Sequence, residues 1–334
     1  MDIFIQKLPK VEIHLHLEAA FSLETLWDLI QKYGGDHEVM DMNNLREKFI
    51  FKDFPHFIKN WVWKNNYLRE YEDFEIIAKS AAEELVRQNI FYAEMSFTPG
   101  DFSRNGLTNA CLLAEKIRKG LNKVKETNVQ LIVDLCRDYG PDEGKHYLYE
   151  LAEVKESLGI VGITIGGSEH EFPPEPYAEV YKLARELGFK CSAHAGEASG
   201  PKSIWGAIES LKVDRIGHGV RSTEDPKLVD YIVEKKIPLE LCPISNIKTN
   251  VISDMSKHSI RILYDRGAVV TVNTDDPLMF NNSMYDDLTE IKQHLGFSNS
   301  DIIQLMKNAI NSSWATESVK REYVKRLSLY DDLP

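Results

Sequence analysis

Histidine and carboxylate residues gather in four short motifs of this chain, and these are the side chains that could do chemistry. The motifs are VEIHLHLE at 11–18, SAHAGE at 192–197, RIGHGV at 215–220 and VNTDDP at 272–277. In the first motif His14 and His16 alternate with apolar residues, so a strand would place both rings on one face. Imidazoles combined with a carboxylate suit zinc or a similar divalent ion. A single histidine pair also fits a hydrogen-bonded structural role, so the elements that carry the other motifs decide between the two.

Eight candidate strands alternate with helix-like stretches along the chain. The strands are expected at 11–18, 91–99, 130–136, 159–167, 189–197, 214–220, 237–245 and 268–276. Apolar residues three or four apart predict helices between them, as at 73–88 and 109–126. The alternation predicts an α/β protein, a single (β/α)8 TIM barrel with additional helices, in which residues 1–334 form one domain. An open doubly wound sheet is the alternative, but no G-x-G-x-x-G or Walker-type loop follows any strand.

The barrel hypothesis makes a specific demand, because barrel enzymes build their active sites at the carboxyl ends of the strands. The unusual polar residues satisfy this demand. The ends of the first, fifth, sixth and eighth expected strands carry His14 and His16, His194 and Glu197, His218, and Asp275 and Asp276. These ends would meet around one mouth, so the sequence predicts a metal site there that has room for a water molecule.

Bulk composition excludes several other classes of protein. The chain has 334 residues, of which 43% are hydrophobic and 28% charged, and no run of about 20 apolar residues that a membrane span requires. A formal net charge of −12 argues against a nucleic-acid partner. The amino terminus does not resemble a secretory signal, so we expect a cytoplasmic protein. Four cysteines without CxxC spacing are expected to be reduced thiols.

In this order and along nearly the whole chain, the four motifs resemble the adenosine deaminase family of the amidohydrolase superfamily. The resemblance implies that one divalent metal ion, zinc, is held by His14, His16, His194 and Asp275. It also implies three catalytic residues around an aminopurine: Glu197 moves a proton at N1, His218 orients an attacking hydroxide, and Asp276 faces N7. Gly167, in TIGGSE, lines up with a glycine whose backbone contacts N3. The expected fourth strand has no lysine to bridge a second metal, which indicates a mononuclear site.

Such residues suit the hydrolytic deamination of an aminopurine. A metal ion lowers the pKa of bound water to about 7 and so supplies a hydroxide nucleophile at neutral pH. Protonation of N1 makes C6 electrophilic, so an acid must stand beside the ring. The H-x-E with P-C-x-x-C signature of the other zinc deaminases is absent from this sequence. The alternatives are a metal-dependent hydrolase of esters or amides and a non-catalytic purine-binding barrel, and the second would not need both Glu197 and His218.

Two departures from the family pattern bear on the substrate. Glu18 and Ala19 stand where adenosine deaminases usually have Asp-Gly, whose aspartate binds the ribose, and Ser168 replaces a more usual acidic residue. We expect adenosine to be converted to inosine, with Glu18 as a ribose contact. The alternative is an adenine deaminase or a deaminase of a modified adenosine nucleoside. The expected partner is a small aminopurine, with no membrane and no nucleic acid, and the oligomeric state stays open.

Some residues receive weaker assignments. The aromatic-rich segment 51–74 is expected either to form a helical lid over the mouth or to pack as an ordinary helix. Glu12 and Glu94 are interpreted as structural groups or as outer partners of the metal-binding histidines. No role is assigned to the remaining histidines, which are His37, His56, His146, His170, His258 and His294.

Overall fold

The architecture is a barrel of eight parallel strands. The computed structural model describes residues 2–52 and 54–330, and its strands are β1 (Lys10–His16), β2 (Ile90–Phe97), β3 (Asn128–Asp134), β4 (Ile160–Thr164), β5 (Lys190–Ala195), β6 (Arg215–His218), β7 (Leu239–Leu241) and β8 (Val270–Val272). Each strand pairs in parallel with the next in sequence. A parallel bridge between Leu15 and Asp275 joins the last strand to the first, and the His16 N–H donates to the Asp275 carbonyl at 3.1 Å. The predicted barrel fold is confirmed.

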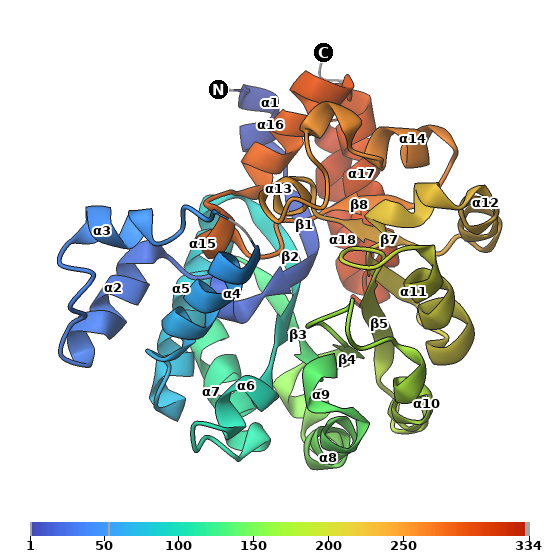
Figure 1. The fold of residues 1–334 in the computed structure, drawn as a ribbon. Helices are drawn as coiled ribbons and strands as arrows, with labels where there is room; N and C mark the ends of the chain where they lie inside the picture. Colours follow the sequence, from blue (N-terminus) through green and yellow to red (C-terminus); the bar gives the residue numbers. More distant parts are fainter. Residues whose placement is uncertain (1, 53, 331–334) are drawn as a thin grey trace.

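Helices surround the barrel and fill most of the connections between strands (Figure 1). The α-helices are α1 (Ile3–Lys7), α2 (Leu23–Lys32), α3 (Met42–Glu47), α4 (Phe54–Asn65), α5 (Tyr71–Arg87), α6 (Pro99–Ser103), α7 (Ala110–Leu121), α8 (Pro141–Ala152), α9 (Lys155–Leu158), α10 (Ala178–Glu186), α11 (Pro201–Gly206), α12 (Pro226–Lys235), α13 (Pro243–Lys248), α14 (Ile260–Asp265), α15 (Pro277–Phe280), α16 (Met284–Leu295), α17 (Asn299–Ser312) and α18 (Glu317–Leu327). Shorter 3₁₀ and π turns are η1 (Leu17–Ala19), η2 (Arg137–Tyr139), η3 (Glu175–Tyr177), η4 (Ala207–Leu211), η5 (Val220–Glu224), η6 (Met255–Lys257) and η7 (Ser328–Tyr330).

Helix α5 shows why these segments are helical. Its residues Phe74, Ile77, Ala81 and Leu85 are buried and recur every three or four positions, so one stripe of the helix faces the barrel. Helices predicted at 73–88 and 109–126 are found as α5 and α7, and all eight predicted strands are found with boundaries shifted by no more than four residues. The strands end early at their carboxyl ends because the chain leaves the ladder there to form the turns that hold the site.

The connection between β1 and β2 is the longest in the barrel. It contains η1 and four helices, of which α2 and α3 project from one side while α4 lies beside the mouth (Figure 1). Helix α4 belongs to the segment 51–74, for which the sequence left open a lid or an ordinary packed helix, and Asp53 of that segment lies outside the described residues. No helix in the described part of the chain is long and apolar enough to cross a membrane.

Candidate metal centre and active site

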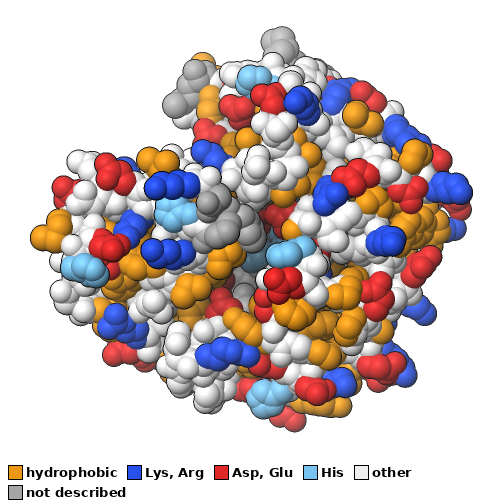
Figure 2. Space-filling view, viewed as in Figure 1, with side chains coloured by type: hydrophobic (Ala, Val, Ile, Leu, Met, Phe, Trp, Pro, Cys, Tyr) orange, Lys and Arg blue, Asp and Glu red, His pale blue; other side chains and the backbone are white. Residues whose placement is uncertain are grey.

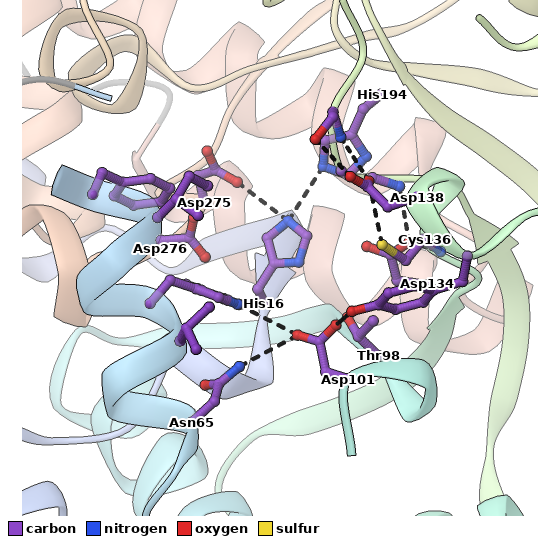
Figure 3. A pocket seen from close by; sticks show the side chains of 18 of the residues that line it. His16, Asn65, Thr98, Asp101, Asp134, Cys136, Asp138, His194, Asp275 and Asp276 are labelled. Carbon is purple, nitrogen blue, oxygen red and sulfur yellow. Dashed lines mark hydrogen bonds and ion pairs between the residues drawn. The ribbon is translucent and has the colours of Figure 1, made fainter. Parts of the chain in front are cut away.

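A cavity of about 490 Å³ opens where the carboxyl ends of the strands meet. The surface is hollowed near the centre of this face of the molecule (Figure 2), and the close view shows side chains from several strand ends directed into the hollow (Figure 3). The expected site residues that line it are His16, Gly167, His194, Glu197, His218, Asp275 and Asp276. His14 lies behind them, with its ring centroid 4.5 Å from that of His194 and 4.8 Å from that of His218.

Four atoms converge at one point with the spacing of a metal coordination shell. His16 Nε2 lies 3.2 Å from His194 Nε2, and Asp275 Oδ1 lies 3.3 Å from Nε2 of both His14 and His16. Zinc held tetrahedrally at its usual bond lengths separates neighbouring ligand atoms by about 3.3 Å. The four residues that the family resemblance names as ligands are therefore brought together at this spacing.

The hydrogen bonding of His14 shows that these atoms fit a cation. His14 Nδ1 lies 2.9 Å from Glu240 Oε2, so the proton of the neutral ring belongs on Nδ1. His14 Nε2 then carries a lone pair, and it is buried without a hydrogen-bond donor while facing the Asp275 carboxylate. Two buried acceptors facing each other are unfavourable unless a proton or a metal cation lies between them, and the Asp275 and Glu240 carboxylates accordingly raise the pKa of His14 to about 10 despite its burial. Two overlapping buried groups that can hold a metal share Asp275: one adds His14, His194 and His218, and the other adds His16 and Asp276.

Outer partners orient the ligands, and the sequence interpretation missed most of them. Glu240 also accepts from Arg215 Nε at 2.5 Å, and Arg215 donates to Glu94 at 2.6 Å. Ser245 Oγ donates to Asp275 Oδ2 at 2.6 Å, and Ser96 Oγ lies 2.9 Å from His16 Nδ1. Such partners fix ring orientation and raise ligand basicity. A carboxylate within the apolar run 237–242 was the available signal for Glu240.

Backbone strain directs two of the site residues. His218 and Asp275 have φ values of 59° and 67°, in the left-handed region that side chains other than glycine rarely adopt. Each such residue costs about 1–3 kcal/mol. Both stand at strand ends, where this conformation turns their side chains into the mouth rather than along the strand.

A buried chain of hydrogen bonds sets the protonation of His218. The Ile260 N–H donates to His258 Nδ1 at 3.2 Å, so His258 carries its proton on Nε2, which lies 3.2 Å from Asn246 Oδ1. The Asn246 amide nitrogen must then face His218 Nδ1, at 3.3 Å. Burial lowers the pKa of His218 to about 3, so its ring is neutral. His218 therefore carries its proton on Nε2, which points into the site 3.4 Å from Glu197 Oε2.

Glu197 stands on the turn after β5, and Glu169 holds that turn in place. The buried Glu169 carboxylate accepts from the backbone N–H of Gly196 at 2.6 Å, Glu197 at 3.0 Å and Ser199 at 2.9 Å. Burial and the neighbouring Asp275 raise the pKa of Glu197 to about 8, so the carboxyl group is largely protonated at neutral pH. A protonated carboxyl group in this position can act as a general acid.

Asp276 also faces the cavity as a carboxyl group that can donate a hydrogen bond. Burial and the adjacent Asp275 raise its pKa to about 7. Asp276 Oδ1 is buried and has no hydrogen-bond partner among the described residues. This side of the cavity thus presents a carboxyl group that is partly protonated at neutral pH and free to bond a ligand.

Two expected site residues do not line the cavity: His14, which lies behind its wall, and Glu18. Strand β1 ends at His16 and continues into the 3₁₀ turn η1, so the alternation that would point Glu18 beside His16 is interrupted. Its fully buried carboxylate accepts from the Thr98 N–H at 2.9 Å instead, and Lys64 Nζ donates to the Glu18 carbonyl. Nothing in the sequence pattern indicated this turn.

An eight-stranded parallel barrel that joins histidines and an aspartate at its mouth, beside a protonated carboxyl group, defines a metal-dependent hydrolase. The adenosine deaminase family model matches residues 9–330, and the chain belongs to this family. It is 32% identical over 333 residues to an adenine deaminase of Vibrio parahaemolyticus, covering 99% of this chain and 98% of the relative. It is 29% identical over 330 residues to an aminodeoxyfutalosine deaminase of Streptomyces avermitilis, covering 98% and 92%.

Solved structures show the same relationship. The crystal structure of an adenine deaminase from Arthrobacter aurescens superposes with a TM-score of 0.89 at 27% identity, covering 97% of this chain and 99% of the other. A zinc-bound amidohydrolase from Burkholderia ambifaria shares the fold, with a TM-score of 0.87 at 24% identity and coverage of 98% and 93%. The protein is a metal-dependent aminopurine deaminase.

Proposed function

We propose that the protein converts adenine to hypoxanthine and ammonia. The observation that carries this proposal is the position of Glu18, the group expected to bind the ribose, whose carboxylate is buried against the Thr98 N–H and does not line the cavity. Relatives named adenine deaminases support the same substrate. The first prediction from the sequence, adenosine as substrate, is therefore replaced by its alternative.

The proposed metal is a single zinc ion held by His14, His16, His194 and Asp275. Imidazole nitrogen and carboxylate oxygen are both donors that zinc accepts, and the orphaned His14 Nε2 fits such a set. When bound, the ion would lower the pKa of water and supply a nucleophile at neutral pH. Glu240 would keep His14 in the tautomer that exposes Nε2, since Nδ1 is already engaged at 2.9 Å.

The residues of this chain would place and protonate the base. Glu197 would donate its proton to N1, which draws electrons from C6 as the nucleophile adds. His218 Nε2–H would donate a hydrogen bond to the attacking oxygen and fix its direction. On the other edge of the ring Asp276 would donate to N7. After addition, the proton of the added hydroxyl group would pass by way of the Glu197 carboxylate to the amino group, which then leaves as ammonia while C6 becomes a carbonyl carbon.

Helix α4 is proposed as the lid expected from the sequence. Asp101 Oδ2 accepts from Trp61 Nε1 at 3.4 Å and from Asn65 Nδ2 at 3.3 Å, which ties the helix to the β2 side of the mouth. The Phe57 ring stacks on Phe280 with centroids 5.3 Å apart. These contacts cover the cavity with apolar rings, which would exclude water from a bound base.

A second candidate substrate is a modified adenosine nucleoside. The cavity volume of about 490 Å³ falls in the range of about 300–1,000 Å³ that accommodates drug-sized ligands. A bare purine would leave part of this space to water, whereas a substituent on N9 would fill it.

Ammonia release from a panel of adenine, adenosine and 5′-modified adenosines tests the proposal. Adenine should have the highest kcat/KM, and a clear preference for any nucleoside would overturn the choice of substrate. Glu197→Gln should keep the metal and bind adenine while losing about 10²–10⁴-fold in turnover. Normal turnover by that variant would reject Glu197 as the acid.

A further inference from the structure

Asp134, at the end of β3, presents one bare carboxylate oxygen to the cavity. Its Oδ1 accepts from the backbone N–H of Cys136 at 2.9 Å and of Gly166 at 2.8 Å. Its Oδ2 forms no hydrogen bond within residues 2–52 and 54–330, and the side chain lines the cavity (Figure 3). A hydrogen-bond acceptor is thus fixed in direction on the wall formed by β3 and β4.

A matching donor lies on the adjoining turn. Gly167 lies on the turn after β4, next to Gly166 in sequence. Its backbone N–H makes no hydrogen bond to any described residue. Asp138 fixes this turn by accepting from the Ser168 N–H at 2.8 Å and from its hydroxyl at 2.6 Å. Only glycine fits at 167, because φ is 92° and a Cβ would lie 2.0 Å from Asp138 Oδ2.

We propose that Asp134 is a specificity-determining residue that accepts the N9–H of a free purine base. The Gly167 N–H then donates to N3, the acceptor next to N9 on the same edge of the ring. This inference rests on the proposed function, since only a free base carries a hydrogen on N9. A nucleoside has a sugar at that atom, so it loses the hydrogen bond and brings its substituent against the carboxylate.

The charge of Asp134 is not explained by its structural contacts. An asparagine would accept the same two backbone N–H groups through one oxygen without placing a charge in the cavity. The Asp134 carboxylate faces a second buried carboxyl group, since burial raises the pKa of Asp101 and the charge of Asp134 adds to that rise. A donor on the substrate would pair with the bare oxygen, and the N9–H is the donor that the free base offers beside N3.

Asp134→Asn tests the inference because it keeps the Oδ1 contacts and replaces the bare acceptor with a donor. The probes are adenine and 9-methyladenine, which differ in the N9 hydrogen. The native protein should have the higher kcat/KM for adenine. The variant should lose about 10- to 150-fold in kcat/KM for adenine, because this is the contribution of a hydrogen bond to a charged group, and its kcat/KM for 9-methyladenine should change little. Asp101→Asn is the matched control, since it removes a charge from the same cavity and should affect both probes equally.

The outcomes separate this inference from the proposed function. One outcome is that the native protein prefers adenine while Asp134→Asn lowers kcat/KM for both probes equally or for neither. In that case Asp134 does not bind the N9–H, and only this inference is wrong. If native protein prefers adenosine, the proposed substrate is wrong, and a selective loss of adenosine activity in the variant would assign the carboxylate to a sugar hydroxyl instead. Metal content measured for each variant shows that the centre is intact.

Discussion

Replacing Asn246 with aspartate should disable the enzyme by changing which nitrogen of His218 carries the proton. In the native protein the Asn246 amide lies 3.3 Å from His218 Nδ1, which leaves the proton of the neutral ring on Nε2. Aspartate has the same shape but only acceptor oxygens, so it favours a proton on Nδ1. His218 Nε2, 3.4 Å from Glu197 Oε2, would then present a lone pair where a donor is needed.

The expected loss is about 10²–10⁴-fold in kcat. Removal of one donor that stabilises developing charge costs about 10²–10³-fold, and a catalytic histidine held in the wrong tautomer costs about 10⁴-fold in a serine protease. The introduced carboxylate would still accept from His258 Nε2, which lies 3.2 Å from Asn246 Oδ1 in the native protein. Because Asn246 is fully buried, the new carboxylate should also lower stability, so turnover is compared per folded, metal-loaded protein.

Ammonia release from adenine gives kcat, while metal content and thermal unfolding show whether the variant is intact. Asn250→Asp is the matched control, because it makes the same chemical change at an exposed position shortly after α13 and should keep native turnover. His258→Gln retains a donor toward Asn246 and should keep more activity than His258→Phe. An Asn246→Asp protein that holds its metal and turns over adenine at the native rate would refute the tautomer argument.

Three further changes have defined outcomes. Asp275→Ala should lower the metal content measured by elemental analysis from near one equivalent, because Asp275 Oδ1 lies 3.3 Å from two ligand nitrogens; full retention would reject it as a ligand. Glu169→Gln should reduce kcat by about tenfold with the metal retained, because the turn that carries Glu197 loses at least one of the three hydrogen bonds that its backbone N–H groups donate to Glu169. Glu171 is exposed, so Glu171→Gln is the control and should leave kcat unchanged. Lys64→Met should remove one pH-dependent contribution to stability, because burial lowers the pKa of Lys64 to about 8 in the folded state. As pH rises from 8 toward 10.5 only the unfolded chain keeps that proton, so the free energy of unfolding measured in urea should rise for the native protein relative to the variant; a difference that stays constant with pH would contradict this.

Local pattern was enough to predict the fold and the group of candidate metal ligands. Apolar periodicity distinguishes strands from helices because the two structures repeat every two and every 3.6 residues. The alternation of His14 and His16 in a strand already places both rings on one face, and barrel geometry places strand ends together. These inferences needed no knowledge of which segments touch, so the barrel could be predicted and the ligands could be grouped.

Tertiary structure alone decided the partners of those residues. Glu240 and His14, or His258 and Asn246, meet because separate segments are brought to one place, and a donor or acceptor cannot be paired by sequence spacing. The direction of Glu18 likewise depended on where β1 gives way to η1, because side chains alternate between two faces only within the strand. The sequence by itself determined which chemistry the chain can do, because residue types and short-range periodicity are local properties. Only the folded chain decided the tautomers, the bare oxygen of Asp134 and the position of Glu18 that supports the proposed substrate, because these depend on distances between residues far apart in the sequence.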